Sequence, residues 1–134
     1  QLAHSLRVDP RVVVLERTNA RDLQPDAVGG PADLTVVDAS FIGLGKLLPA
    51  IARCTRRGGH LVALIKPQFE VGRHAASRTR GVVRDEAERA AAVDATVEAV
   101  AAAGLEVLGR ADSVLPGPKG NLEAFVHARV RASL

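Results

Sequence analysis

Three charged side chains stand where the strands predicted from this sequence end or begin, and together they could handle a proton. Asp38 and Lys66 each follow a short apolar run directly, and Glu123 lies near the beginning of the last run. Ligands of open α/β sheets bind outside the carboxyl ends of the parallel strands. If the last strand is antiparallel, its beginning lies at that same edge, and the three side chains converge. A lysine between two carboxylates is normally held protonated, so Lys66 could orient a hydroxyl group, and would act as a base only where burial removed its proton.

Each of these side chains, and also Asn19, has a purely structural interpretation. Asp38 could cap the helix that follows it, because Asp is a favoured N-cap residue. Lys66 could be a solvated charge at a strand end, and Glu123 could be a charge that keeps an edge strand from pairing with other chains. Asn19 could be a turn residue. Residue types alone leave both interpretations open.

The order of apolar runs and turn signals predicts strands that alternate with helices. Aliphatic and β-branched runs predict buried strands, whereas spacings of three and four residues predict helix faces. Strands are predicted over 12–15, 34–37, 61–65, 105–108 and 122–130, and helices at 1–7, from Leu44 through Leu47, Leu48 and Ile51 to a cap at Gly58, and over 86–103 after the cap Asp85. The pattern indicates an α/β fold with a mostly parallel sheet and an antiparallel C-terminal strand.

The composition suits a single domain with an aliphatic core. The 134 residues are 47% hydrophobic, with three Phe and no Trp, Tyr or Met. Cys54 is the only cysteine and the four histidines show no ligand spacing, so we expect neither a disulfide nor a metal site. No apolar run is long enough to span a bilayer, and we expect a cytoplasmic protein without a membrane partner. The chain begins at Gln1 without a methionine, so an upstream segment could be missing.

A long loop rich in arginine and glycine is predicted between the third strand and the last helix. It carries Arg73, Arg78, Arg80 and Arg84, and it borders the proposed strand-end site because it follows Lys66. Such a loop suits contact with phosphate groups, and the net charge of +3 permits a polyanionic partner. A mobile, solvated loop is the alternative for any one of these arginines.

Five segments of the chain strongly resemble the TlyA family, whose members are known both as ribosomal RNA 2′-O-methyltransferases and as "hemolysin A". The segments are DPRVVVLERTNARDL (9–23), DLTVVDASFIGL (33–44), LVALIKPQFEVGR (61–73), GVVRD (81–85) and LPGPKGNLEAF (115–125). The resemblance covers essentially the whole chain, and KPQFEVG and LPGPxGNxE are its most distinctive motifs. The family is similar in fold to the FtsJ-type RNA methyltransferases, which implies a Rossmann-like sheet that binds S-adenosylmethionine.

The resemblance implies a catalytic role for the three strand-end residues. FtsJ-type enzymes use a Lys-Asp-Lys-Glu tetrad, in which Asp38 corresponds to the Asp, Lys66 to the second Lys and Glu123 to the Glu. The first Lys has no counterpart in this sequence and would lie upstream of it. Three of the four catalytic residues are therefore expected in the chain.

The resemblance also implies where the cofactor binds. It places Asn19 and Ala20 beside the adenine of S-adenosylmethionine and Asp38 near its methionine end. The first strand with its Gly-rich loop, and an S4-like RNA-binding domain, would lie upstream of Gln1. Residues 1–134 are then expected to form a partial FtsJ-like methyltransferase domain that lacks the first cofactor-binding strands.

The implied reaction is transfer of a methyl group to a ribose 2′-hydroxyl of ribosomal RNA, without a metal. The residue types suit it, because a hydroxyl is a poor nucleophile until its proton is withdrawn or polarised. Two alternatives stay open: a truncated, catalytically silent RNA-binding remnant, and the pore-forming protein that the hemolysin name suggests. The absence of a membrane-spanning or strongly amphipathic segment from the sequence argues against a pore-former. Sheet edges left exposed by the lacking strands would favour a homo-oligomer.

Overall fold

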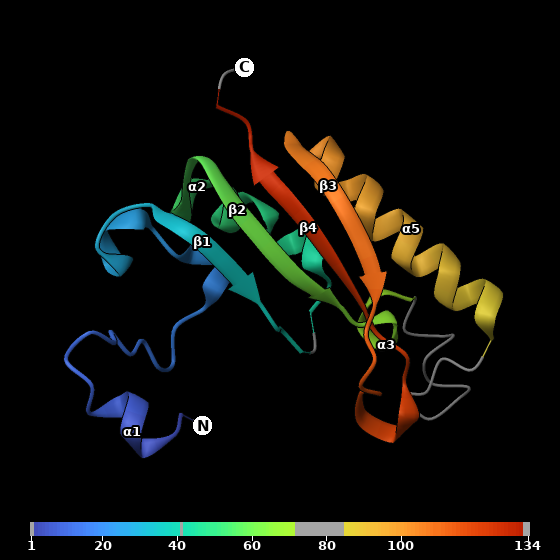
Figure 1. Cartoon of the computed structure of the whole chain (residues 1–134), viewed down its shortest axis with the longest axis horizontal. Coiled ribbons are helices and arrows are strands. Elements are labelled where there is room, and N and C mark those ends of the chain that lie inside the picture. Colours follow the sequence, from blue (N-terminus) through green and yellow to red (C-terminus); the bar gives the residue numbers. More distant parts are fainter. Residues whose placement is uncertain (1, 41, 72–84, 133–134) are drawn as a thin grey trace.

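A four-stranded sheet forms the centre of the computed structural model, which describes residues 2–40, 42–71 and 85–132 (Figure 1). The strands are β1 (Ala32–Val37), β2 (Thr55–Ile65), β3 (Leu105–Asp112) and β4 (Ala124–Val130), in the order β1-β2-β4-β3 across the sheet. β1 pairs with β2 in parallel, whereas β4 is antiparallel to both β2 and β3. β3 therefore points the same way as β1 and β2, which confirms the predicted sheet, mostly parallel with an antiparallel C-terminal strand.

Two helices pack on this sheet, and shorter helical segments connect the other elements. α2 (Leu48–Cys54) precedes β2, and α5 (Glu86–Ala102) precedes β3. The side chain of Asp85 accepts hydrogen bonds from the backbone N–H groups of Ala87 (2.8 Å) and Glu88 (3.2 Å), so it is the N-cap of α5, as predicted. The shorter elements are α1 (His4–Arg7), α3 (Pro67–Glu70) and the 3-10 helices η1 (Ala20–Asp22), η2 (Pro25–Val28), η3 (Leu44–Lys46) and η4 (Pro118–Gly120).

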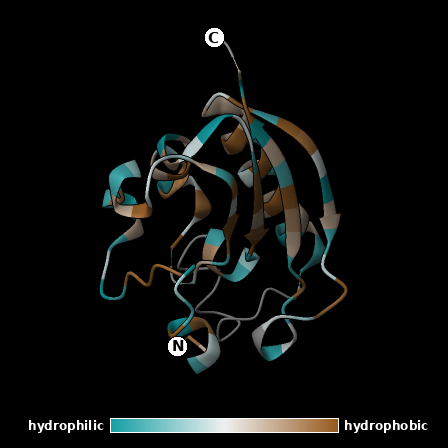
Figure 2. Ribbon diagram, turned by 60° about the vertical axis from the view of Figure 1, so that its left-hand side comes forward, coloured by the Kyte–Doolittle hydropathy of each residue, from teal (hydrophilic) through white to brown (hydrophobic). Residues whose placement is uncertain are grey.

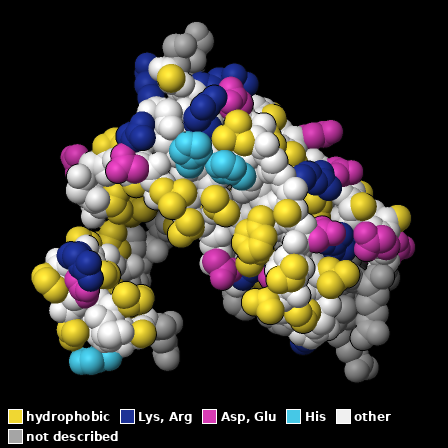
Figure 3. Space-filling view, viewed as in Figure 1, with side chains coloured by type: hydrophobic (Ala, Val, Ile, Leu, Met, Phe, Trp, Pro, Cys, Tyr) yellow, Lys and Arg dark blue, Asp and Glu magenta, His cyan; other side chains and the backbone are white. Residues whose placement is uncertain are grey.

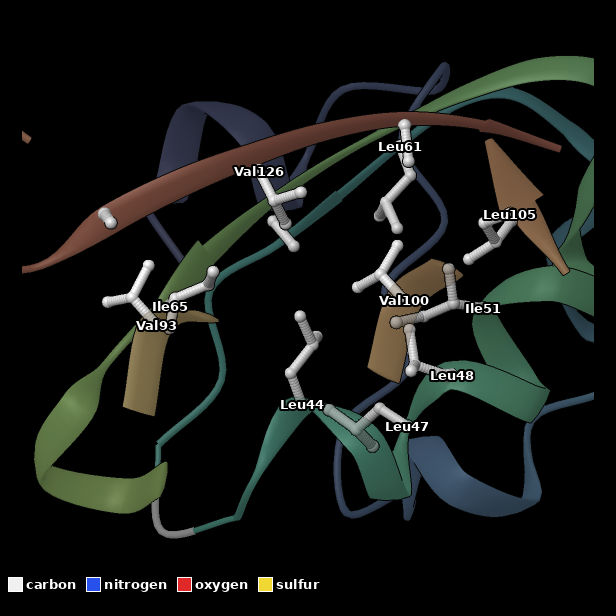
Figure 4. Close-up of a cluster of buried hydrophobic side chains, with 13 residues drawn as sticks. Leu44, Leu47, Leu48, Ile51, Leu61, Ile65, Val93, Val100, Leu105 and Val126 are labelled. Carbon is white, nitrogen blue, oxygen red and sulfur yellow. The ribbon is translucent and has the colours of Figure 1, made fainter. Parts of the chain in front are cut away.

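The hydrophobic core lies between the helices and one face of the sheet. Leu61, Ala63 and Ile65 are fully buried on β2, as is Val126 on β4, because alternate residues of a strand point to the same face. The helical side chains that meet them in Figure 4 are Leu44, Leu47, Leu48, Ile51, Val93 and Val100. The predicted apolar helix face is therefore confirmed, and Figure 2 shows hydrophobic residues (brown) concentrated along these strands and helices. This packing fixes β2, which carries Lys66 at its end.

The opposite face of the sheet is much less covered in the described part of the chain. The rings of His60 and His127 stack on it, with Nδ1 of His60 2.9 Å from Nε2 of His127. Phe125 is 39% exposed beside them, and Figure 3 shows histidine and hydrophobic side chains gathered on this face. On the edge strand β1, Leu34 and Val36 are exposed too. Self-association through a sheet edge stays a prediction.

The prediction of a strand over 12–15 is wrong. These residues belong to no strand, and none of the four strands of the sheet pairs with them. Val13 and Leu15 are exposed, and Figure 1 shows this segment (blue) apart from the sheet. An apolar run becomes a strand only when a neighbouring strand satisfies its backbone N–H and C=O groups. Apolar composition alone does not provide that neighbour.

Helix α2 ends earlier than the sequence pattern indicates. The pattern places the helix cap at Gly58, but α2 ends at Cys54 and Thr55 begins β2. Gly58 does have a left-handed conformation, with φ of 77°. It lies in a stretch of β2 where the pairing with β1 is irregular. A left-handed glycine fits a strand irregularity as well as a helix cap, so the residue type did not distinguish the two.

Arg89 joins α5 to the strands that follow it. Its buried guanidinium donates hydrogen bonds to the backbone carbonyl of Leu122 (3.1 Å) and to the carboxylates of Asp112 (2.8 Å) and Glu86 (3.3 Å). The hydrogen bond to Asp112 is the main cause that raises the pKa of Arg89 above its ordinary value. Because Leu122 directly precedes Glu123, Arg89 also holds the backbone from which Glu123 projects.

Replacing this arginine should therefore destabilise the fold. We expect Arg89→Met to lower the free energy of unfolding by about 1–3 kcal/mol, because the hydrogen bonds of a buried charged donor are lost. Urea denaturation followed by circular dichroism measures the change. Arg110→Met is the matched control, since Arg110 pairs with Asp94 on the surface at 2.6 Å and should contribute less than about 1 kcal/mol. Equal losses in the two variants would contradict the role given to Arg89.

Candidate active site

Asp38 and Lys66 lie in contact at the carboxyl ends of β1 and β2. The Nζ atom of Lys66 is 2.5 Å from Oδ1 of Asp38 and donates a hydrogen bond to the Ser40 hydroxyl at 3.0 Å. The parallel register pairs Val37 with Ala63, so the residues that follow both strands emerge at the same edge of the sheet. The structure thus brings together two of the three residues that the sequence placed at this edge.

The two partners of this ion pair differ in their exposure. The Lys66 side chain is only 11% exposed, whereas that of Asp38 is 70% exposed. Lys66 is therefore not a solvated charge at a strand end. Asp38 is not a helix cap either, because Gly43 is the N-cap of η3 and Leu47 that of α2. Both structural interpretations are wrong, and a nearly buried ammonium faces a carboxylate at the rim of the site.

Glu123 is buried immediately before β4, with 5% exposure. β4 lies between β2 and β3, so Glu123 is not a charge that protects an edge strand. The antiparallel register pairs Ile65 with Ala124, which brings Lys66 and Glu123 to the same end of two neighbouring strands. The carboxylate of Glu123 nevertheless accepts its hydrogen bond from Gln68, whose Nε2 lies 2.9 Å from its Oε2. Asp38 and Lys66 are therefore in direct contact, as predicted. Glu123 is related to them through Gln68, which follows Lys66 in the chain.

The short helix α3 connects the parts of this site. It directly follows Lys66, and besides the contact of Gln68 with Glu123 it carries Glu70, whose Oε1 accepts a hydrogen bond from the backbone N–H of Leu44 at 2.7 Å. The sequence reasoning missed Gln68 and Glu70 as parts of the site. The signal that could have found them is the distinctive KPQFE motif, in which they follow Lys66 at alternate positions.

An apolar cavity of about 280 Å³ lies beside the Asp38 end of β1. Its lining includes Ala20 and Asp38, two of the residues predicted to bind the cofactor, and aliphatic side chains such as Leu23 and Ile51, which the sequence reasoning missed. Pockets for small ligands combine mostly apolar walls with a few polar groups. An aliphatic wall suits the flat base of an adenosyl group, and the Asp38 carboxylate at its rim suits a polar part of the same ligand. The residues present therefore fit this end of S-adenosylmethionine.

Arg53 of α2 holds η1 over this cavity. Its guanidinium donates hydrogen bonds to the backbone carbonyls of Leu23 (2.7 Å) and Arg21 (2.6 Å). Asn19 is the N-cap of η1, because its Oδ1 accepts a hydrogen bond from the backbone N–H of Arg21 at 3.0 Å. It therefore has the structural role of a turn residue that was considered for it above. Binding of the adenine by Asn19 and Ala20 stays a prediction. Arg53 could not be found from the sequence, where it looks like any helix arginine.

The predicted RNA-contacting arginines, Arg73, Arg78, Arg80 and Arg84, lie outside the described residues. Their contact with phosphate groups stays a prediction. In the described ranges, no group of three or more His, Cys, Asp or Glu side chains could hold a metal ion. No helix in those same ranges has the length and apolar character needed to cross a membrane.

Comparison with known proteins finds relatives about twice as long as this chain. The chain is 50% identical over 131 residues to the 16S/23S rRNA (cytidine-2′-O)-methyltransferase TlyA of Mycobacterium tuberculosis, a match that covers 98% of the chain and 48% of that protein. The structure of a protein from Streptococcus thermophilus named as a hemolysin superimposes with a TM-score of 0.91 and 35% identity, over 99% of this chain and 48% of that one. The chain thus spans about half the length of these relatives.

The likeness in fold extends to more distant proteins. A SAM-dependent methyltransferase from Methanosarcina mazei superimposes with a TM-score of 0.55 at 14% identity, over 85% of this chain and 65% of that one. This likeness shows the fold alone, and it confirms the methyltransferase sheet that was expected. The family model of FtsJ-like methyltransferases matches residues 1–130, nearly the whole chain. The chain therefore belongs to the family of FtsJ-like methyltransferases.

Proposed function

We propose that this chain carries the catalytic side of an S-adenosylmethionine-dependent RNA methyltransferase that acts on a ribose 2′-hydroxyl of ribosomal RNA. The observation that carries this proposal is the Asp38–Lys66 ion pair at the ends of two parallel strands, beside an apolar cavity. The name of the M. tuberculosis relative, an rRNA (cytidine-2′-O)-methyltransferase, supports the choice of substrate.

Lys66 is the residue that holds the substrate hydroxyl. An ammonium group has three N–H donors. Two of them are directed to Asp38 and Ser40 in the described contacts, and we assign the third to the ribose 2′-oxygen. A hydrogen bond from a nearly buried donor fixes the direction of that oxygen. Such alignment supplies a large part of the rate of a displacement reaction.

Asp38 has two roles in this proposal. Its carboxylate holds the Lys66 ammonium in place, and its exposure at the rim lets it accept the hydroxyl proton as the ribose oxygen forms its new bond to carbon. When bound, S-adenosylmethionine would supply the electrophilic methyl group, whose bond to sulfur breaks and leaves S-adenosylhomocysteine, and Ala20 with the aliphatic cavity wall would hold its adenosyl part. Glu123 contributes a buried carboxyl group at the neighbouring end of β4.

A catalytically silent RNA-binding remnant is the second candidate function, and one observation favours it. Asp38 lines the cavity and is still 70% exposed, so the cavity is open to solvent at this end of the edge strand β1. An open cavity buries less of a ligand than an enclosed one and binds it less tightly. Cofactor binding is therefore the property that separates the two candidates.

Isothermal titration calorimetry with S-adenosylmethionine measures that property. Methyltransferase function predicts saturable binding, weakened about tenfold or more by Ala20→Leu, because the larger side chain occupies cavity space at a cost of roughly 1.4 kcal/mol. Ala27→Leu, on the exposed surface of η2, is the matched control and should leave binding unchanged. Suppose instead that residues 1–134 bind no cofactor, while a chain that joins them to the upstream half of the M. tuberculosis relative binds it clearly. The silent remnant would then be favoured.

Methyl transfer itself tests the role of Lys66. Lys66→Ala should reduce transfer of a tritiated methyl group to ribosomal RNA about 10²-fold or more, because the donor that aligns the hydroxyl is lost. Far-ultraviolet circular dichroism should stay unchanged. Lys46→Ala, at an exposed position of η3, should keep full turnover. Both variants are assayed in residues 1–134 and in the joined chain, and wild-type turnover by Lys66→Ala would contradict the assignment.

A further inference from the structure

We propose that Gln68 is a positioning residue that fixes the carboxylate of Glu123 beside the site of ribose methylation, an inference that rests on the function proposed above. Gln68 lies in α3, two residues after Lys66, and its Nε2 donates a hydrogen bond to Oε2 of Glu123 at 2.9 Å. Both residues are buried, with exposures of 7% and 5%. The contact joins the end of β2 to the beginning of β4 inside the protein.

The amide of Gln68 can make this contact in only one orientation. Turned by half a revolution, it would place its carbonyl oxygen against the carboxylate, and two acceptors repel each other. In the observed orientation, Oε1 of Gln68 is buried without a hydrogen-bond partner among the described residues, which is unfavourable. An aliphatic side chain of similar length would avoid that cost. Glu123 therefore orients the Gln68 amide, and we take the hydrogen bond to Glu123 to be the function of that amide.

The backbone at Gly117 also packs closely against the Glu123 carboxylate. A Cβ atom at position 117 would collide with Oε2 of Glu123 and lie 2.9 Å from its Oε1, so only glycine allows this approach. The backbone N–H of Gly117 donates to the carbonyl of Asn121 at 2.6 Å, which keeps the turn in place. The carboxylate is thus confined by the Gln68 amide and by the Gly117 backbone.

Helix α3 links this fixed carboxylate to the Asp38–Lys66 pair. Lys66 is the N-cap residue of α3, and Glu70 ties the helix to the backbone N–H of Leu44. A shift of α3 would therefore displace Lys66 together with the amide that holds Glu123. Displacement of a catalytic group by about 1 Å can cost about 10²-fold in rate. Gln68 sets the position of a negative charge relative to Lys66 and acts through Glu123.

Nuclear magnetic resonance of the chain, labelled at the glutamate carboxyl carbons, tests the contact. The Glu123 resonance is assigned from its loss in Glu123→Gln. It should shift in Gln68→Met, which keeps the length of the side chain and removes the donor, and in Gly117→Ala, whose added methyl group would displace the carboxylate. Gly45→Ala is the matched control, because a Cβ there meets nothing within 4 Å, and should leave the resonance in place.

Kinetics of methyl transfer to ribosomal RNA tests the function of the contact. Gln68→Met and Gly117→Ala should each lower kcat about 10²-fold and change KM for RNA by less than about twofold. In a Glu123→Gln background, Gln68→Met should cause no further loss, because a residue that acts through the Glu123 carboxylate has no effect once that group is absent. A merely structural role for Gln68 would not produce this dependence.

Two results would overturn the proposal. One is a Glu123 resonance that stays unshifted in both variants, and the other is an equal loss of kcat from Gln68→Met in the wild-type and Glu123→Gln backgrounds. Gly117→Ala keeps the test decisive if Gln68→Met fails to fold. A wild-type protein that transfers no methyl group, in residues 1–134 or in the joined chain, would count against the proposed function instead. The resonance would still decide whether Gln68 fixes Glu123.

Discussion

The candidate site depends on the parallel pairing of β1 with β2. Two parallel strands need a crossover between them, and here α2 lies in that crossover and packs its apolar face against the sheet. The resulting register sends the chain out of both strands at one edge, where the nearly buried Lys66 meets the exposed Asp38. A shift of one residue in this pairing would turn the side chains of one strand to the other face. The chemistry of the site is therefore fixed by backbone hydrogen bonds and by the core beneath them.

The single short segment 66–70 then contacts the ends of two strands and the helix η3. Within the KPQFE motif, Lys66 reaches the end of β1, Gln68 the beginning of β4, and Glu70 the backbone at η3. A helix of four residues has almost no stability of its own. Its position therefore depends on the same hydrogen bonds that arrange the charged groups. In this part of the molecule, the same hydrogen bonds stabilise the local fold and set the geometry of the candidate site.

The sequence was sufficient for the features that follow from the order of elements. Asp38 and Lys66 could be placed together because strand direction follows from topology, and topology from the alternation of strands and helices. The conformation of residues 12–15 could not be predicted, because a strand forms only where a neighbouring strand pairs with its backbone N–H and C=O groups. The same holds for Gln68, whose partner Glu123 is distant in the sequence. Burial of Glu123 was likewise hidden, since a charged residue near a strand end is exposed in most proteins.

The central claim is that this edge of the sheet directs a methyl group to a ribose oxygen of RNA. Mass spectrometry of nucleosides from ribosomal RNA, incubated with S-adenosylmethionine and the protein, measures the position of the new methyl group directly. The geometry of Lys66 and Asp38 predicts a nucleoside that carries the methyl on its ribose and an unmodified base. A methyl group found on a base would contradict the claim, because the Asp38–Lys66 pair is assigned to a hydroxyl nucleophile.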